Sequence, residues 1–241
     1  MRVHLALDTA TPFGSVAVGT SQGAIAEASV GHRRHAAATL PAVEEALRLA
    51  GARFADLDGI VIADGPGSFT GLRIGFATAK GILHEHPTLT LRLAPSLLAL
   101  AWGARPFAEG AIAALYDALR GDVFAAVYAF GGGEVETLLA PCLTTPAELT
   151  RTLPRPAIAV GDGAAVHASL MLEWTGRPPV GPPAAVPRAA ALLELLGVPG
   201  ATNLVEDPAG VEPTYGRVAE AQARWERAHG RPLPHPPGGT S

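Results

Sequence analysis

Residues 59–81 read GIVIADGPGSFTGLRIGFATAKG, and this stretch decides the fold of the chain. It opens with an apolar β-branched run at 60–63, which is typical of a short buried strand. The Gly-Pro-Gly-Ser at 65–68 predicts a turn, because two glycines supply backbone freedom and the proline fixes one φ angle. Helical spacing follows from Thr70 to Leu83, with Ser68 or Thr70 as the N-terminal cap. We therefore expect a strand, a tight glycine turn and a helix.

The turn and the helix start together form a candidate loop for an anion or a partner, at Gly65, Gly67, Ser68 and Thr70. Backbone N–H groups at a helix start favour negative charge. A purely structural turn is the alternative, because the stretch matches neither the Walker phosphate loop, nor the dinucleotide fingerprint, nor the nucleophile elbow. The only lysine of the chain, Lys80, stands near the other end of the helix.

The composition is that of a globular protein. The chain has 241 residues, of which 48% are hydrophobic and 17% charged, enough for a sizeable core in one or two domains. A net charge of −4 without a basic run disfavours strong unaided binding to tRNA or DNA. The single cysteine, Cys142, excludes an internal disulfide and a multi-cysteine zinc site. With no signal-peptide pattern and no apolar membrane span, we expect a cytoplasmic protein.

Turn residues divide the chain into two similar units. The first unit is expected to contain strands at 3–10, 15–19, 24–30, 60–63 and 89–93 and helices at 35–50, 70–83 and 95–104. After a linker at 104–110, the second is expected to contain strands at 111–115, 123–130, 135–142 and 157–160 and helices at 146–153 and 189–196. A helical piece at 218–229 and a disordered tail at 232–241 complete the chain. The repeated order predicts a duplicated α/β fold.

Two helices of the first unit carry more apolar surface than one sheet can cover. Apolar side chains span about 200° of the helix at 35–50, twice the stripe that a surface helix needs. The next helix has a ridge of small residues at every fourth position. We therefore predict a partner or dimer interface, made by Leu40, Val43, Leu47, Gly71, Leu72, Gly75 and Ala79. Packing of the two helices against each other within the chain is the alternative.

Asp8 and Thr9 place a carboxylate and a hydroxyl at the end of the first strand. Such a pair can orient a metal-bound water or contact a phosphate, and the alternative is that both side chains cap turn amides.

The histidines of the sequence do not indicate a metal site. The chain has no His-x-x-x-His pair, and His84 and His86 stand at a helix C-terminus, where solvated cations are favoured.

Several stretches resemble the TsaB (YeaZ) family of tRNA threonylcarbamoyladenosine biosynthesis proteins. LALDTAT at 5–11, with SVAV at 15–18, is similar to the family's opening, and GPGSFTGLRIG at 65–75 resembles its most recognisable string. Weaker similarities lie at 117–124 and in EPTYGR at 212–217. The middle signature usually has arginine directly after Asp-Ala, whereas here Leu119 precedes Arg120. The resemblance covers roughly residues 3 to 217.

The resemblance implies both a fold and a role. The fold is two actin-like (ribonuclease-H-like, ASKHA) lobes, a complete one at residues 1–104 and a reduced C-terminal one at 111–217. The role is that of a non-catalytic scaffold subunit in the complex that transfers threonylcarbamoyl to adenosine 37 of tRNAs reading ANN codons. The implied partners are the catalytic paralogue TsaD, the ATPase TsaE, a second copy when the chain is alone, and tRNA indirectly through the complex.

The resemblance also makes Asp8, Thr9, Gly161 and Gly163 candidates for a vestigial nucleotide site. It implies no cofactor and no metal on this chain, with ATP only at the level of the complex. The helix that holds the paralogue's metal-binding histidines corresponds to about residues 96–105, which contain none. A lone actin-like kinase or hydrolase that uses Asp8 is the alternative function. A zinc peptidase comes last, because the histidine pair that it requires is missing.

Overall fold

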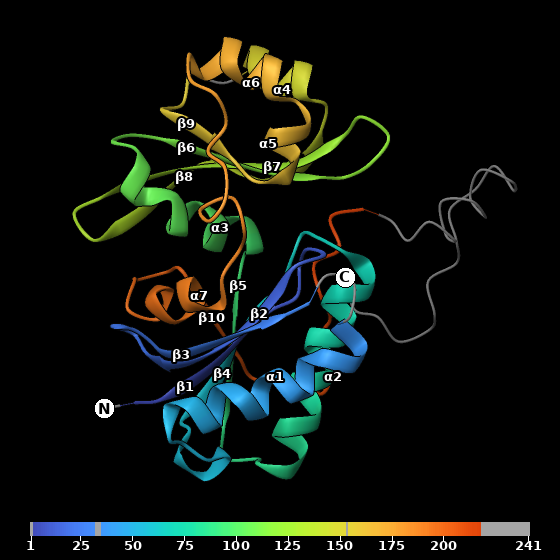
Figure 1. Ribbon diagram of the computed structural model, residues 1–241, viewed down its shortest axis with the longest axis vertical. Coiled ribbons are helices and arrows are strands. Elements are labelled where there is room, and N and C mark those ends of the chain that lie inside the picture. Colours follow the sequence, from blue (N-terminus) through green and yellow to red (C-terminus); the bar gives the residue numbers. More distant parts are fainter. Residues whose placement is uncertain (1, 32–34, 153, 218–241) are drawn as a thin grey trace, which may run out of the picture.

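The computed structural model describes residues 2–31, 35–152 and 154–217, which form two β-sheets with helices around them (Figure 1). The first sheet has six strands in the order β10-β5-β4-β1-β2-β3. Their bounds are β1 His4–Asp8, β2 Gly14–Thr20, β3 Gly23–Val30, β4 Gly59–Ala63, β5 Thr90–Ala94 and β10 Asn203–Val205. The first three strands form the expected antiparallel meander, and β4 and β5 run parallel to β1.

The second sheet repeats this order in a shorter form. Its four strands follow the order β8-β7-β6-β9, which corresponds to β3-β2-β1-β4 of the first sheet. Their bounds are β6 Ile112–Asp117, β7 Val123–Gly131, β8 Glu134–Thr144 and β9 Ile158–Val160. The described chain adds no counterpart of β5 to this sheet. The fold is therefore the duplicated α/β fold that the sequence pattern predicts, and its complete first lobe and reduced second lobe agree with the actin-like fold that the family resemblance implies.

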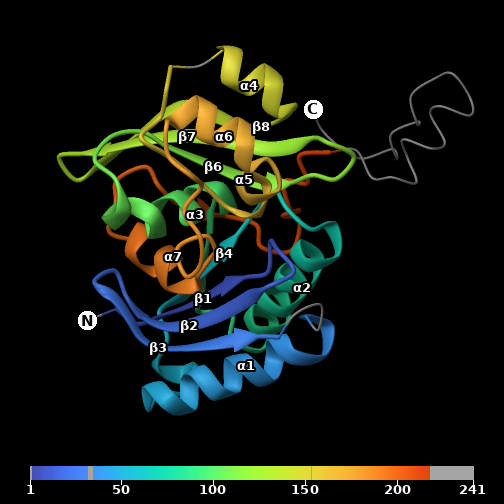
Figure 2. The same cartoon turned by 45° about the horizontal axis from the view of Figure 1, so that its top comes forward.

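The helices and sheets alternate in layers, which Figures 1 and 2 show from two directions. The helices are α1 His35–Ala50, α2 Phe69–Glu85, α3 Ser96–Ala104, α4 Pro146–Thr152, α5 Asp162–Val166, α6 Ala168–Thr175 and α7 Ala189–Leu195, with 3₁₀ turns η1 Phe54–Asp56 and η2 Arg105–Phe107. One apolar core lies between α1, α2 and the first sheet. A second core joins the facing sides of both sheets through α3 and α7, and a third lies under α4 to α6.

The layer between the sheets explains why α3 has no polar face. Eight of its nine residues are buried, because it packs on β6 and β7 from one side and on α7 from the other. A helix that is apolar all round is stable in water only when it is covered on all sides. The two lobes are therefore joined by a continuous core.

Three features differ from the sequence-based expectation. The helices α5 and α6 were not expected, because the glycines at 161 and 163 indicate a turn. The strand β10 pairs antiparallel with β5, and α7 packs on β1, β2 and β3. Residues 189–205 thus lie with the first sheet, although the division predicted from the sequence places them in the second lobe.

The predicted helical piece at 218–229 and the tail at 232–241 lie outside the described residues. No described helix has the length and apolarity of a membrane span.

Candidate functional site

The glycine turn between β4 and α2 is held from within the chain. The backbone N–H of Ser68 donates to the carbonyl of Ala10 at 2.7 Å, and the Ser68 hydroxyl accepts from the N–H of Gly71 at 3.2 Å, which confirms Ser68 as the cap. Gly65 has a φ of 118°, and a Cβ there would overlap the carbonyl of Thr214. Because the chain itself uses the donors of Ser68 and Gly71, these contacts favour the structural turn over the anion loop.

The small-residue ridge of α2 faces the end of β1. A Cβ on Gly71 would meet the carbonyl of Thr9, and a larger side chain at Gly75 would meet the Thr9 hydroxyl. Ala79 is completely buried in the core under α2. The ridge therefore brings a helix close to a strand within the chain, which corrects its expected role as a partner surface.

The other predicted interface residues divide by exposure. Val43 and Leu47 are buried in the core between α1, α2 and the first sheet, and Leu72 is buried in the core that joins the two sheets. These three residues support the fold, whereas Leu40 is 50% exposed. The residues of α2 that do reach the surface are others, such as Thr70, Ala77 and Gly81. The outer side of these two helices, which we call the α1–α2 face, replaces the predicted set of interface residues. It consists of the exposed residues Leu40, Glu44, Thr70, Ala77 and Gly81.

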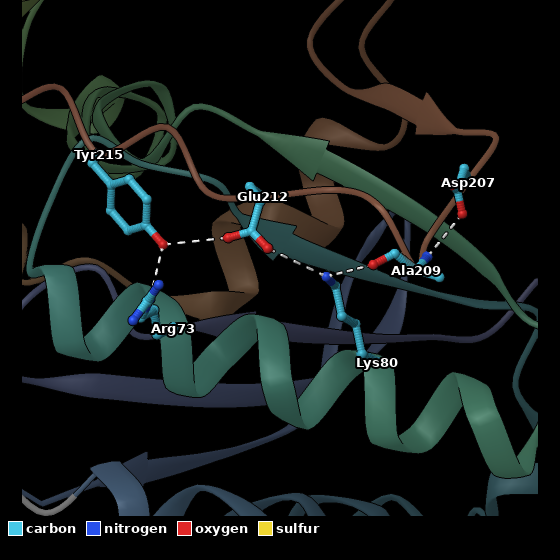
Figure 3. Close-up of polar contacts among 6 residues, drawn as sticks. All are labelled: Arg73, Lys80, Asp207, Ala209, Glu212 and Tyr215. Atoms are coloured by element: carbon cyan, nitrogen blue, oxygen red, sulfur yellow. Dashed lines mark hydrogen bonds and ion pairs between the residues drawn. The ribbon is translucent and has the colours of Figure 1, made fainter. Parts of the chain in front are cut away.

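A C-terminal strap, residues 206–217, runs along one flank of α2 (Figure 3). The Nζ of Lys80 donates to the carbonyl of Ala209 at 2.9 Å and lies 3.8 Å from a carboxylate oxygen of Glu212. The Nε of Arg73 donates to the Tyr215 hydroxyl at 3.1 Å, and the Tyr215 ring packs on Phe69 with 4.6 Å between centroids. The strap therefore forms the border of the α1–α2 face.

The strap also reaches the second lobe. The N–H of Thr214 donates to the carbonyl of Asp64 at 2.8 Å, and Gly216 lies against Phe124 of β7. The guanidinium of Arg217 pairs with the carboxylate of Asp122, which follows the β6 strand. In the sequence, EPTYGR at 212–217 is distinguished only by its resemblance to the family. These contacts give the segment a physical role, as a brace between α2 and the second lobe.

Asp8 ends β1, close enough to Tyr116 of the second lobe for its charge to act on that side chain. Its side chain is fully buried, one carboxylate oxygen accepts from the N–H of Ala10 at 3.0 Å, and the other has no partner among the described residues. Burial raises the pKa of Asp8 to about 6. Thr9 is also buried, with its carbonyl and hydroxyl against the α2 glycines. In this arrangement neither side chain is open to a nucleotide.

The second half of the predicted nucleotide site packs on β6. Cβ atoms on Gly161 and Gly163 would overlap the backbone at Leu115 and Tyr116. The Asp162 carboxylate accepts from the N–H groups of Asp117 and Gly163, at 3.0 and 2.8 Å. This loop is therefore a tight turn against the strand.

Tyr116 links the two halves of the predicted nucleotide site. Burial raises the pKa of Tyr116 well above its usual range, and the charges of Asp8 and Asp162 add to this shift. The structure thus brings the two halves near one tyrosine. In the parts of the chain that the structure describes, no group of three or more His, Cys, Asp or Glu side chains is arranged for a metal ion.

The strand order and the two lobes define the class, a two-lobed protein of the actin-like fold. A family model described as "TsaD: tRNA N6-adenosine threonylcarbamoyltransferase" matches residues 26–173. The tRNA threonylcarbamoyladenosine biosynthesis protein TsaB of Bacillus subtilis is 30% identical over 227 residues, which cover 92% of this chain and 96% of the relative. The chain belongs to the TsaB (YeaZ) family.

Two further similarities agree with this assignment. YeaZ from Pseudomonas aeruginosa has a solved structure with a TM-score of 0.68 and 30% identity, over 82% of this chain and 91% of that chain. A tRNA N6-adenosine threonylcarbamoyltransferase of Sorangium cellulosum is 47% identical over 53 residues, 22% of this chain and 15% of the relative. The chain is thus similar along its length to TsaB, and over a shorter stretch to a transferase.

Proposed function

We propose that this protein takes part in the biosynthesis of N6-threonylcarbamoyladenosine in tRNA, as a scaffold subunit that docks onto the transferase paralogue TsaD. The name of the Bacillus subtilis relative supports the pathway. The match to the transferase family model supports a paralogous pair, in which the same elements of the shared fold could meet as they do in a symmetric dimer.

The α1–α2 face is the observation that carries this proposal. Both helices are fixed on their inner sides by a well-packed core, so their outer sides form a rigid surface. That surface combines an exposed leucine, Leu40, with the small residues Ala77 and Gly81. Small residues on a helix allow a second helix to approach closely, and burial of an exposed leucine under a partner favours association. We propose that TsaD covers this face, and that a second copy covers it when TsaD is absent.

The same geometry supports a non-catalytic role. Asp8 is fully buried, Asp162 is bound to backbone N–H groups, and the donors of Ser68 and Gly71 serve the turn. A nucleophile or general base must come within hydrogen-bond reach of its substrate. We therefore propose that the transfer chemistry belongs to TsaD, that ATP is used only in the complex with TsaE, and that this chain carries no cofactor.

An omission experiment tests the proposal. tRNA, threonylcarbamoyl-adenylate, TsaD and TsaE are incubated with and without this protein, and modified adenosine is measured by nucleoside mass spectrometry. We expect product only when the protein is present, and none from the protein alone. Equal product without it would refute the proposal. Calorimetric binding of ATP and Mg²⁺ to the isolated chain would favour the alternative, a kinase or hydrolase that acts alone.

A further inference from the structure

The second lobe contains an open depression of about 1010 Å³ that lies apart from the α1–α2 face. It is formed where the chain leaves α3 for β6, where it enters β9 and where it leaves α6. The charged and aromatic side chains that line it are Arg105, Phe107, Glu109, Arg155 and Arg177. Three arginines from distant parts of the sequence thus meet at one place, although the sequence has no basic run.

Two of these arginines have no partner in the described part of the chain. Arg155 and Arg177 are exposed, and no hydrogen bond or ion pair joins either guanidinium to another described residue. Arg105 is different, because it lies 3.3 Å from the carboxylate of Glu194 and stacks on the ring of Trp102. Two uncompensated guanidinium groups in one depression attract an anion, and guanidinium binds phosphate through paired hydrogen bonds.

The backbone at the end of α6 leaves space for the side chain of Arg155. Gly176 ends α6 in the left-handed conformation, with a φ of 71°. The guanidinium of Arg155 occupies the space where a Cβ of residue 176 would lie. The C-terminal end of a helix favours a positive charge at this place. The Arg155 guanidinium thus lies beside this helix end, and it makes no hydrogen bond to another described residue.

An aromatic side chain completes the set. Phe107, at the end of η2, is 50% exposed at the same depression. Arginines that bind phosphates, combined with an aromatic ring on which an unstacked base can lie, are the usual components of surfaces that bind single-stranded RNA. A site for a small molecule would enclose most of its ligand, whereas Arg155, Arg177 and Phe107 are all exposed.

We propose that this depression contacts the phosphate backbone of RNA, with one unstacked base on Phe107. The inference rests on the proposed function, in which the RNA is tRNA. The segment between α3 and β6 lies on the opposite side of the molecule from α2 (Figures 1 and 2), so a partner on the α1–α2 face leaves the depression open. Glu109 and the net charge of −4 limit the affinity of the chain alone. The contact therefore strengthens tRNA binding by the complex.

The test measures binding of a fluorescent tRNA transcript that reads an ANN codon to the reconstituted complex with TsaD, at several salt concentrations. Arg155→Gln/Arg177→Gln is expected to weaken binding about tenfold or more at 0.1 M salt. It should also lower the slope of log K against log salt by about 0.7 to 0.9 for each lost phosphate contact. Phe107→Ala should weaken binding about fivefold with an unchanged slope. Arg2→Gln/Arg53→Gln, two exposed residues of the first lobe, removes the same charge and should change neither quantity.

Three results would overturn the inference. The first is an unchanged affinity of the Arg155/Arg177 variant for tRNA, and the second is an equal loss of tRNA affinity in the Arg2/Arg53 control. The third is displacement of tRNA from this depression by millimolar ATP, which would indicate a nucleotide site. The omission experiment separates this failure from that of the proposed function. If the protein is required for modified adenosine while the variants bind tRNA normally, only the RNA contact is wrong.

Discussion

The Nε of Arg73 on α2 lies 3.1 Å from the hydroxyl oxygen of Tyr215, which stands 142 positions further along the chain. The same hydroxyl is 3.5 Å from the carboxylate of Glu212, and Glu212 also faces Lys80 (Figure 3). A segment without helix or strand is thus fixed on the helix that carries the glycine turn. Exposed ion pairs contribute little by themselves, so the ring contact with Phe69 and the backbone hydrogen bond from Thr214 to Asp64 contribute more to holding the strap.

Tyr215→Ala should release the strap from α2. The variant loses the Phe69 contact and both hydrogen bonds, and we expect the strap at 206–217 to exchange amide hydrogens at least about fivefold faster, which corresponds to about 1 kcal/mol of local stability. Tyr215→Phe keeps the ring and should lie between the variant and the wild type. Hydrogen exchange read by mass spectrometry measures this, and equal protection in all three proteins would contradict the account of the strap.

Gly75→Ala should destabilise the protein, because the added methyl group meets the Thr9 hydroxyl inside the first lobe. We expect a loss of about 1–3 kcal/mol in the free energy of unfolding. Gly81 lies on the exposed side of the same helix with no atom near its Cβ position, so Gly81→Ala should be neutral or stabilising by up to about 1 kcal/mol. Urea unfolding of both variants measures these free energies. Equal stability of the two variants would show that the ridge does not face β1.

The stability of the protein should fall as the pH rises from about 4 to 6. The folded-state pKa of Asp8 is raised to about 6, so the folded state holds this proton more tightly than the unfolded chain, whose carboxyl group titrates near pH 4. The free energy of unfolding therefore decreases through this window and levels off above it, by at most about 3 kcal/mol for this group. Asp64, whose pKa burial also raises to about 6, adds to the same decrease.

Asp8→Asn should remove a large part of this pH dependence. Its free energy of unfolding, measured in urea at pH 4.5 and 7.5, should change less between the two values than that of the wild type. Asp56→Asn is the matched control, because Asp56 is exposed and a hydrogen bond from Arg53 lowers its pKa. A wild-type slope that persists in Asp8→Asn/Asp64→Asn would mean that other groups cause it.

Local patterns predicted most of the architecture. The β-branched runs, the Ser68 cap and the repeated strand order each depend on neighbouring residues, and the structure confirms them. The spacing of the ridge on α2 does not indicate which neighbour it contacts, because it is the same whether a partner helix or the end of β1 lies against it. Only the packing around Gly75 distinguishes the two.

Long-range relationships could not be predicted from one sequence. The pairing of β10 with β5, the brace formed by the strap and the three arginines of the second lobe all join segments that are far apart in the chain. No local periodicity carries such information. The exposed residues of the α1–α2 face became clear only when the buried side of each helix was known, as the contrast between Ala77 and Ala79 illustrates.

We propose that this protein supports tRNA modification by docking its α1–α2 face onto TsaD. The most direct test measures complex formation with TsaD and the yield of modified adenosine for Leu40→Arg/Ala77→Arg, beside Leu138→Arg on β8 of the second lobe. All three residues are exposed, so the variants should stay folded. We expect the α1–α2 variant to lose at least about a hundredfold in affinity for TsaD, together with the modified product, because a central interface charge is costly to desolvate. The Leu138 variant should keep both, and normal docking and product with the α1–α2 variant would contradict the account.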